Sequence, residues 1–375
     1  MKLNDLSHDI NEWFSGGGPQ GDIVMSSRVR LARNLAKYKF VSRCSPEEKS
    51  NILAQLKKVL MGLDLDGDVF YVEIDKASNL DRSVLVERHL ISRHHAMGQG
   101  PRGAVIAERE FFSGMVNEED HLRLQVLKPG CQLATCAELI NRVDDQIEQQ
   151  VDYAFSPRFG YLTACPTNVG SGIRISVMVH LPALKLVGHL ERFLNAAQDM
   201  NLAVRGLFGE GTEATSDLYQ ISNQATLGIA EDELIKDFED RIIPEIVAYE
   251  NAARRQLLGG QVKVLDDKIS RAVALLQNAH LISSQEALVL LSHLRMGMNM
   301  RHYLDASTPA INRLGQLFDK EAVRTNDAAI TLINRLFMLT LPAHLQINHG
   351  KKLDAGMRDE LRAQVIRAAL GKSTS

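Results

Sequence analysis

The residues in this sequence whose types best suit chemistry are five arginines in strand-like segments: Arg28, Arg30, Arg123, Arg174 and Arg205. Around the first four, apolar and polar residues alternate, so an antiparallel sheet would collect the arginines on its open face. Guanidinium groups on one face repel one another unless an anion lies among them, and their planar forks bind phosphate bidentately. The pattern therefore leaves two interpretations open. The arginines form a site for a nucleoside triphosphate, or each is a separate solvated strand residue.

Acidic residues could complement such an anion site. Asn117-Glu118-Glu119-Asp120-His121 places three carboxylates just before the strand of Arg123. They are either a solvated turn or a site for Mg²⁺ or a cationic substrate. Glu210 is isolated in a Gly-Glu-Gly segment, which we interpret as a mobile loop that presents its side chain.

Two glycine-rich segments, 170–172 and 206–211, follow or precede these strands. Their backbone N–H groups could approach phosphate, but neither segment matches the P-loop or the dinucleotide fingerprint. Cys165 lies in Ala-Cys-Pro-Thr-Asn, before the first of these segments. It is either a small apolar packing residue or a thiolate near cations.

The elements that position these residues divide the chain into two parts. Ser45-Pro46-Glu47-Glu48 is a capping box that predicts a helix to about Leu60. Further helices are expected at 80–91 and 134–150, and strands at 22–25, 68–74, 103–108, 111–116, 121–127, 173–180, 202–207 and 218–223. After about residue 230 helical periodicity dominates. We predict an α+β fold: a short segment 1–20, a mainly antiparallel sheet flanked by helices in 21–245, and an all-α domain in 246–375.

Composition excludes several classes of protein. Lys+Arg number 43 against 46 Asp+Glu, and this net charge of -3 argues against a dedicated nucleic-acid binder. The four cysteines lack zinc spacing and favour a reducing, cytoplasmic compartment. The polar N-terminus has no signal core, and no run approaches the roughly 18 apolar residues of a membrane helix. We therefore predict no nucleic-acid or membrane partner.

Four segments, in order along the chain, resemble motifs of the phosphagen (ATP:guanido) kinase family. They are Ser26-Ser27-Arg28-Val29-Arg30, Asn117-Glu118-Glu119-Asp120-His121, Cys165-Pro166-Thr167-Asn168 and Arg205-Gly206-Leu207-Phe208-Gly209-Glu210. The resemblance covers about residues 20–230, and chance agreement at four ordered motifs is negligible. It implies the guanidino kinase catalytic fold and transfer of the γ-phosphate of ATP, with Mg²⁺, to a guanidinium group.

The resemblance also implies residue roles. Glu119 and Glu210 would hold the guanidinium, Cys165 would tune it, and no protein residue is assigned to a metal. Nucleotide binding would draw on Ser26, Ser27, Arg28, Val29, Arg30, His89, Arg123, Arg174, Ile175, Ser176, Val177, Met178, Arg205, Gly206, Leu207, Phe208, Gly209 and Glu210. His89 rests on the short match Val86-Glu87-Arg88-His89-Leu90 and could equally be a packing residue.

Within the family, the chain is more similar to the bacterial protein-arginine kinases of the McsB type. It lacks the N-terminal helical domain that encloses free substrates, and a helical extension follows the catalytic domain. Residues 358–363 match the RDxxRA motif of that branch, which implies an allosteric phosphoarginine site at Arg358, Asp359, Arg362 and Ala363. On spacing alone, Arg358 and Arg362 are neighbours on a solvated helix face.

This branch implies protein substrates recognised through arginine and a homodimer formed through the C-terminal region. It also implies protease or adaptor partners, for which the chain carries no signature. The alternatives are a kinase for free arginine, a phosphoarginine-binding adaptor with reduced catalysis, and a nucleotide-binding regulator. The missing N-terminal domain argues against the first, and the intact acidic and arginine motifs argue against the second.

Overall fold

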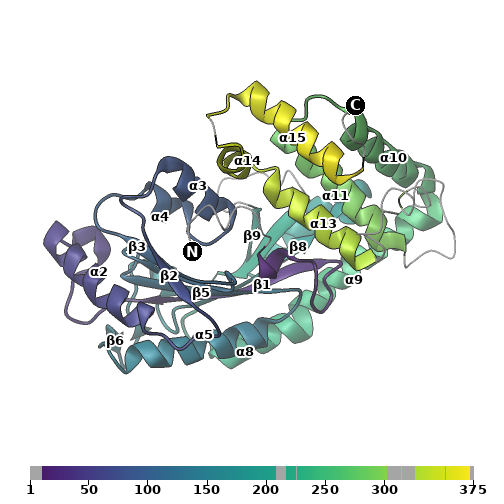
Figure 1. The fold of residues 1–375 in the computed structure, drawn as a ribbon. Helices are drawn as coiled ribbons and strands as arrows, with labels where there is room; N and C mark the ends of the chain where they lie inside the picture. Colours follow the sequence, from purple (N-terminus) through teal and green to yellow (C-terminus); the bar gives the residue numbers. More distant parts are fainter. Residues whose placement is uncertain are drawn as a thin grey trace.

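The protein is described by a computed structural model that covers residues 11–207, 217–224, 226–301, 314, 326–350 and 352–371. An antiparallel sheet forms the centre, and a group of helices packs against one end of it (Figure 1). The strand order is β2-β3-β4-β5-β1-β8-β10-β9. The strands are β1 (Val24–Arg33), β2 (Val69–Glu73), β3 (Gly103–Ala107), β4 (Phe112–Val116), β5 (Leu122–Pro129), β8 (Ile173–His180), β9 (Leu202–Gly206) and β10 (Leu218–Asn223), and a separate hairpin pairs β6 (Phe155–Ser156) with β7 (Gly160–Tyr161).

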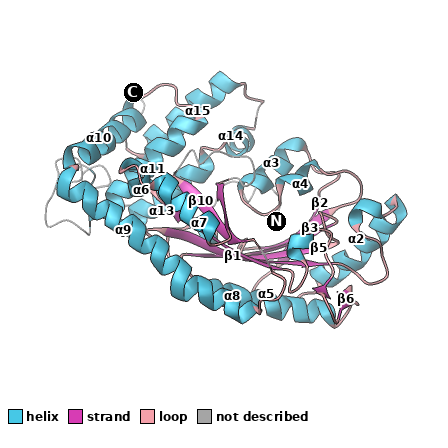
Figure 2. Ribbon diagram, turned by 180° about the vertical axis from the view of Figure 1, so that it is seen from behind, coloured by secondary structure: helices cyan, strands magenta, loops and turns pink. Residues whose placement is uncertain are grey.

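Helices lie on both sides of the sheet, as the two opposite views show (Figure 2). Helix α5 packs on β1 and β5 and covers the apolar face, while α3 and α4 lie over the other face near β2 and β3. The helices of this part are α2 (Pro46–Met61), α3 (Asn79–Glu87), α4 (Arg93–Met97), α5 (Leu133–Glu148), α6 (Pro182–Leu186) and α7 (Leu190–Asp199). Those that follow are α8 (Glu231–Asp237), α9 (Ile243–Gly260), α10 (Val262–Asn278), α11 (Ser284–Met300), α13 (Asn326–Leu339), α14 (Pro342–His349) and α15 (Ala355–Ala369).

The predicted fold class is confirmed, and so is the capping box of α2. The Ser45 hydroxyl accepts from the Glu48 N–H while the Glu48 carboxylate accepts from the Ser45 N–H. The strand expected at 22–25 and the strand-like segment of Arg28 and Arg30 are parts of one central strand, β1, which runs from Val24 to Arg33. This strand pairs with both β5 and β8.

The sheet register gives its two faces opposite characters. Arg30 lies opposite Arg174 on one neighbouring strand and opposite Gln125 on the other. Val29, one position away, faces the core and is fully buried. Because side chains alternate along every strand, polar residues line one face from β5 to β9 and apolar residues fill the other.

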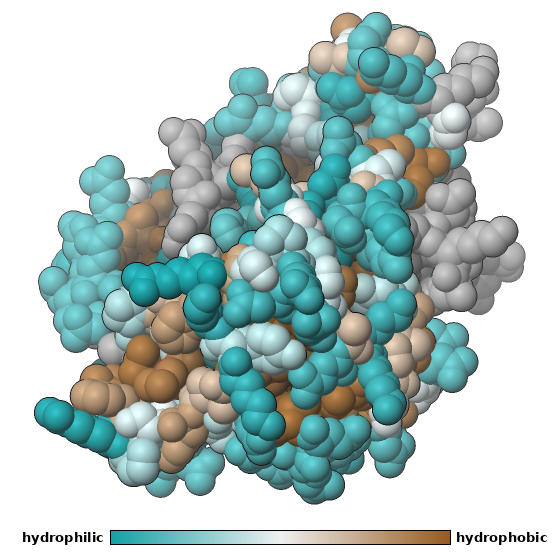
Figure 3. All heavy atoms as spheres, turned by 90° about the vertical axis from the view of Figure 1, so that its left-hand side faces the viewer, coloured by the Kyte–Doolittle hydropathy of each residue, from teal (hydrophilic) through white to brown (hydrophobic). Residues whose placement is uncertain are grey.

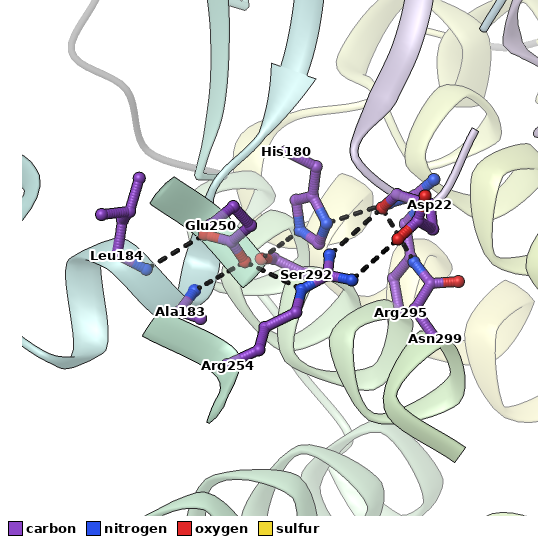
Figure 4. A network of polar contacts seen from close by, with 9 residues as sticks. All are labelled: Asp22, His180, Ala183, Leu184, Glu250, Arg254, Ser292, Arg295 and Asn299. Carbon is purple, nitrogen blue, oxygen red and sulfur yellow. Dashed lines mark hydrogen bonds and ion pairs between the residues drawn. The ribbon is translucent and has the colours of Figure 1, made fainter. Parts of the chain in front are cut away.

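A buried polar network joins the start of β1 and the end of β8 to helices α9 and α11 (Figure 4). Arg295 donates to the carbonyls of Gly21 (2.6 Å) and Asp22 (2.9 Å) and to Nδ1 of His180 (2.9 Å). Since arginine can only donate, Nδ1 of His180 accepts, and its Nε2–H faces the Ser292 hydroxyl at 2.8 Å. The helical part is therefore anchored directly to two central strands.

A second arginine completes this network. Arg254 is fully buried and donates to Glu250 (3.2 Å) and to the Asp22 carboxylate (2.9 Å). Glu250 also accepts the backbone N–H groups of Ala183 and Leu184. Burial raises the pKa of Glu250 to about 7, although Arg254 and these N–H donors favour the carboxylate.

Arg254→Met is expected to lower the free energy of unfolding by about 3–5 kcal/mol, because it leaves the buried Glu250 carboxylate without its charged partner. The measurement is the midpoint of urea unfolding at neutral pH. Arg255→Met, at the exposed neighbouring position of α9, is the matched control and should change stability by less than about 0.5 kcal/mol. Equal effects of the two substitutions would contradict the role given to Arg254.

In the part of the chain that the structure describes, no single helix is long and apolar enough to cross a membrane. The pair Asp327–Leu339 and Pro342–His349, bent by 84°, passes such a test only when taken together and only by length and composition.

Candidate active site

The polar face of the sheet opens into a cavity of about 820 Å³, a volume typical of small-molecule sites. Four strands of the sheet supply arginines to it, and α3, α4 and the segment around Cys165 supply other walls. Predicted site residues that line it are Arg28, Arg30, His89, Glu119, Arg123, Cys165, Arg174, Arg205 and Leu207. The five arginines singled out by alternation thus share one cavity.

The arginines of this cavity are crowded. Burial, followed by the charges of Arg123, Arg174 and Arg205, lowers the pKa of Arg28 to about 9. Burial and the neighbouring guanidinium groups also place the pKa of Arg30 well below its usual value. Among the described residues, Nε and Nη2 of Arg30 are buried and meet no hydrogen-bond partner. A polyanion would relieve the repulsion and accept these N–H groups.

Hydroxyl groups on neighbouring strands hold two of these arginines in place. Nε of Arg28 donates to Ser176 (3.2 Å), and Nη2 of Arg174 donates to Ser222 (3.1 Å). Each bond joins residues on adjacent strands of the sheet, so the orientation of the guanidinium groups follows from the strand register.

Glu118 is a structural carboxylate of the cavity wall. It accepts from Arg123 (2.8 Å), from the Ser92 hydroxyl (2.6 Å) and from the backbone N–H of Glu119 (2.8 Å). Burial opposes ionisation, but the charge of Arg123 and these donors hold the pKa of Glu118 well below its usual range. Glu118 therefore fixes Arg123 and remains ionised.

Glu119 differs from its neighbour. Its side chain is exposed at the cavity edge, and burial together with the adjacent Glu118 charge raises its pKa above the ordinary value. A carboxylate with a raised pKa at the edge of a cationic cavity suits a base that accepts a proton from a bound cation.

The remaining polar residues of the 117–121 turn hold the backbone together. Asp120 accepts from Nδ2 of Asn34 (2.6 Å) and from the N–H of Ala164 (2.7 Å). Nδ1 of His121 accepts from the N–H of Leu35 (2.9 Å). The sequence alone presented three equivalent carboxylates, whereas in the structure Glu118 and Asp120 accept hydrogen bonds and Glu119 is exposed at the cavity.

His89 lies in a tight turn that forms one wall of the cavity. Its backbone has φ +58°, in the left-handed region, and its carbonyl accepts from Nε2 of Gln125 (2.6 Å). Burial, followed by the charges of Arg28 and Arg93, lowers the pKa of His89 to about 3. Its ring packs edge-on against Trp13, with centroids 5.2 Å apart. A neutral His89 can pack beside the arginines without adding to their charge.

The turn that carries His89 is also clamped by helix α14. The Glu87 carboxylate accepts from the backbone N–H of Ala343 (2.8 Å) and from Nδ1–H of His344 (2.8 Å). The adjacent Arg88, 1% exposed, forms a bidentate pair with Glu110 and also faces Nε2 of His344. The C-terminal helices thus contact the cavity wall directly.

Cys165 is one of the residues that line the cavity. Its Sγ is 3.0 Å from the Thr167 hydroxyl, and a short helical turn, Pro166–Asn168, follows it. Cys165 is only half-buried and lines the cavity, so a pure packing role does not fit it.

Not every predicted nucleotide-binding residue faces the cavity. The side chains of Ser27, Val29, Ile175 and Val177 lie on the buried side of the sheet, and Ser27 donates to the carbonyl of Gly130. Ser26, Ser176 and Met178 instead line a small recess beside Trp13 and His89. Gly206 ends β9, and the predicted residues Phe208, Gly209 and Glu210 lie outside the described residues.

Several cavity residues carried no clear sequence signal. Ser92 and His94 begin a short helix, and their role depends on Glu118, 26 residues away from Ser92. Gln220 could have been found, because it alternates with the buried Ile221 on a strand whose position was predicted.

The acidic residues of the cavity indicate how Mg²⁺ would be held. Across the described residues there is no group of three His, Cys, Asp or Glu that could hold a metal. Of the lining carboxylates, Glu118 is already paired with Arg123, whereas the Glu119 side chain is exposed at the cavity. This fits an ion held mainly by nucleotide phosphates, with one carboxylate at most, as is usual for Mg²⁺.

Comparisons with known proteins identify the family of the catalytic part. Residues 51–253 match the family described as ATP:guanido phosphotransferase, C-terminal catalytic domain. Among solved structures, lombricine kinase superposes with TM-score 0.54 at 26% identity, covering 66% of this chain and 70% of its own. A duplicated taurocyamine kinase from Schistosoma mansoni gives TM-score 0.57 at 26% identity over 61% of this chain and 33% of that longer one. Fold and site thus define a guanido phosphotransferase.

The C-terminal part of the chain identifies the subgroup within the guanido phosphotransferases. Residues 262–325 and 323–375 match the protein-arginine kinase McsB C-terminal domain. The protein-arginine kinase of Halothermothrix orenii is 40% identical over 99% of both chains, and that of Bacillus pumilus is 38% identical over 99% of this chain and 96% of its own. The chain belongs to the protein-arginine kinase family.

The predicted phosphoarginine motif lies on α15. Arg362 is 1% exposed and donates to the carbonyls of Thr340 (2.8 Å) and Ile282 (2.8 Å) and to Asp359. The solvated face expected from spacing alone is therefore wrong for Arg362, because α10 and α14 pack against α15 and Arg362 is buried there. Ala363 is buried too, and Arg358 donates to the Leu353 carbonyl.

A second cavity of about 780 Å³ lies close to this motif. Ser284, Leu341 and Pro342 line it together with Arg82 and Arg93 from α3 and α4. Leu341 and Ser284 are sequence neighbours of the residues whose carbonyls hold Arg362, although Arg362 itself does not line the cavity.

Proposed function

We propose that this protein is a kinase that transfers the γ-phosphate of ATP to the guanidinium of arginine residues in proteins. The observation that carries the proposal is the pairing of one available carboxylate, Glu119, with five converging arginines in a single cavity. The arginines suit a triphosphate and Glu119 suits a cationic acceptor. Family membership supplies the acceptor, since relatives matched over 99% of the chain are named protein-arginine kinases.

The nucleotide lies on the polar face of the sheet, with its phosphates among Arg28, Arg30, Arg123, Arg174 and Arg205. Mg²⁺ would be held chiefly by the phosphates and would supply neutralising charge for the transferring group. Arg30 contributes N–H groups that have no other acceptor in the described residues. Arg123 is held rigid by Glu118 and so presents its guanidinium without loss of side-chain freedom.

Arginine has a pKa above about 12, so its nitrogen is a poor nucleophile until a proton is removed. Glu119 accepts that proton, and Glu210 forms the second half of a clamp around the flat cation. The nitrogen then forms a bond to the γ-phosphorus while the bond to the bridging oxygen breaks, and ADP leaves with the electron pair. Cys165 lies beside the acceptor and tunes it without forming a covalent intermediate.

The same family membership supports further parts of the proposal. The motif at 358–363, near the second cavity, binds phosphoarginine away from the active site and regulates the kinase. The protein works in the cytoplasm as a homodimer and has protease or adaptor partners.

The proposal is tested by incubating the full chain with ATP, Mg²⁺ and a denatured protein that contains arginine. Acid-labile phosphate should form on arginine, as identified by mass spectrometry of peptides kept at neutral pH. The control is the denatured substrate protein with each of its arginines replaced by lysine, which should remain unlabelled. Phosphate on free arginine with none on protein would contradict the proposed acceptor.

A further inference from the structure

A shallow groove of about 510 Å³ lies on the surface beside the catalytic cavity. Arg158, Phe159 and Gly160 form one wall, and Leu227 to Ile229 form the other. Large apolar side chains stand out around it: Phe159 is 44% exposed, Leu227 57% and Ile229 39%. Phe155, at the base of the same hairpin, is 56% exposed.

The floor of this groove is made of closely packed backbone. The N–H of Tyr161 donates to the carbonyl of Gly170 (2.8 Å), and a Cβ on Gly160 would overlap that same carbonyl. A Cβ on Gly170 would meet the carbonyl of Thr226 at 3.0 Å. Gly160 and Gly170 both have positive φ, so glycine is needed here for conformation and for space.

The groove and the catalytic cavity share a wall. The Thr226 hydroxyl donates to the carbonyls of Thr167 (3.1 Å) and Val169 (2.8 Å). Thr167 lines the catalytic cavity, as does Gln224, while Thr226 lines the groove. The shared segment is the one that carries Cys165, next to the place proposed for the acceptor guanidinium.

When the arginine side chain of a polypeptide enters the cavity, the residues on either side of that arginine must lie on the adjoining surface. The view onto the side that carries α2 and β6 shows apolar patches among hydrophilic side chains over its lower part (Figure 3). An extended peptide can place one apolar side chain in such a groove while its arginine reaches inward, because neighbouring side chains point to opposite sides.

We infer that this groove, lined by Phe159, Leu227 and Ile229, binds the substrate polypeptide next to its acceptor arginine and selects an apolar residue there. The inference rests on the proposed function, and it names the class of acceptor: unfolded or extended segments in which arginine has a large apolar neighbour. Such segments are exposed when a protein core opens, since large apolar residues are normally buried.

The test uses a set of peptides with one arginine and serine elsewhere, in which a single leucine is placed in turn at each position on either side. Wild-type protein should favour leucine at one or two of these positions by about tenfold to a hundredfold in kcat/KM, the effect of burying one large apolar side chain. Leu227→Ser should remove this preference and leave the rate on the all-serine peptide unchanged. Leu275→Ser, at an exposed position on α10, is the matched control.

Each result has a distinct meaning. A flat preference in the wild type, or a preference that Leu227→Ser and Phe159→Ser both leave intact, would overturn the groove assignment. So would an equal loss on all peptides, because that result indicates that the groove packs against the enzyme's own active-site segments. Absence of phosphoarginine on every peptide, together with none on denatured protein, would instead sink the proposed function.

Discussion

Glu119→Gln should reduce phosphorylation of protein arginine by about 10²- to 10⁴-fold, the usual contribution of a positioned general base. Glutamine keeps the size and hydrogen-bonding ability of the side chain but cannot accept the proton. Nucleotide binding should persist, because the arginines that hold the phosphates are anchored by Glu118, Ser176 and Ser222 and not by Glu119. The measurements are kcat with saturating protein substrate and the Kd for ATP from equilibrium binding.

Glu138→Gln, an exposed substitution on the opposite side of the sheet, is the control and should leave both values unchanged. If Glu119→Gln retained near-normal kcat, another group would have to take the proton. Loss of ATP binding in the same variant would show instead that Glu119 acts on the nucleotide.

The pH dependence of the reaction gives an independent check on this role. Glu119 acts in its deprotonated form, and its pKa is raised by burial and by the adjacent Glu118 charge. The rate should therefore fall as pH is lowered, with a midpoint above the ordinary glutamate value of 4.5. This acid limb should disappear in Glu119→Gln. A limb that persists unchanged in the variant would belong to another residue.

Arg30→Met is expected to have opposite effects on function and stability. Loss of a phosphate-binding guanidinium should lower kcat/KM for ATP by about 10²- to 10³-fold. The nucleotide-free protein should nevertheless become more stable, by about 1–3 kcal/mol, because buried donors without an acceptor are removed and repulsion from Arg28 and Arg174 ends. Thermal unfolding with and without ATP measures both effects in one series.

Arg43→Met replaces an exposed arginine and should alter neither quantity. The crossing of the two effects separates a binding role from a structural one. If the variant were less stable without nucleotide, Arg30 would support the fold. The cluster of arginines on the polar face would then not be explained by an anion-binding site.

The arginine face could be predicted from sequence because the strand period of two is local information. Arg123 and Arg174 each sit between apolar residues, so their shared parity is visible without a structure. The choice among the acidic residues could not be read this way. Asn34 and Ser92 decide which carboxylates are occupied, and they lie 86 and 26 residues from Asp120 and Glu118.

Charge inside regular elements was the other source of error. In β1 the segment of Arg28 and Arg30 is strand-like by alternation, but its continuity from Val24 to Arg33 depends on pairing with strands distant in sequence. Arg362 was similar, because its helical spacing resembles that of a solvated residue. Its burial depends on the carbonyls of Thr340 and Ile282, which a pattern within one helix cannot reveal.

The network around Asp22 has a consequence for how the chain is made. Arg295 donates hydrogen bonds to backbone carbonyls at the start of the central strand, yet it follows Asp22 by 273 positions in the sequence. During synthesis the sheet must therefore wait for most of the protein before its first strand gains these donors. Pairings so distant in sequence slow folding and prolong the exposure of unfinished surfaces. A fragment that stops before α11 would lack Arg295, so the carbonyls before β1 would never receive these hydrogen bonds. The catalytic half should therefore be poorly soluble when produced alone.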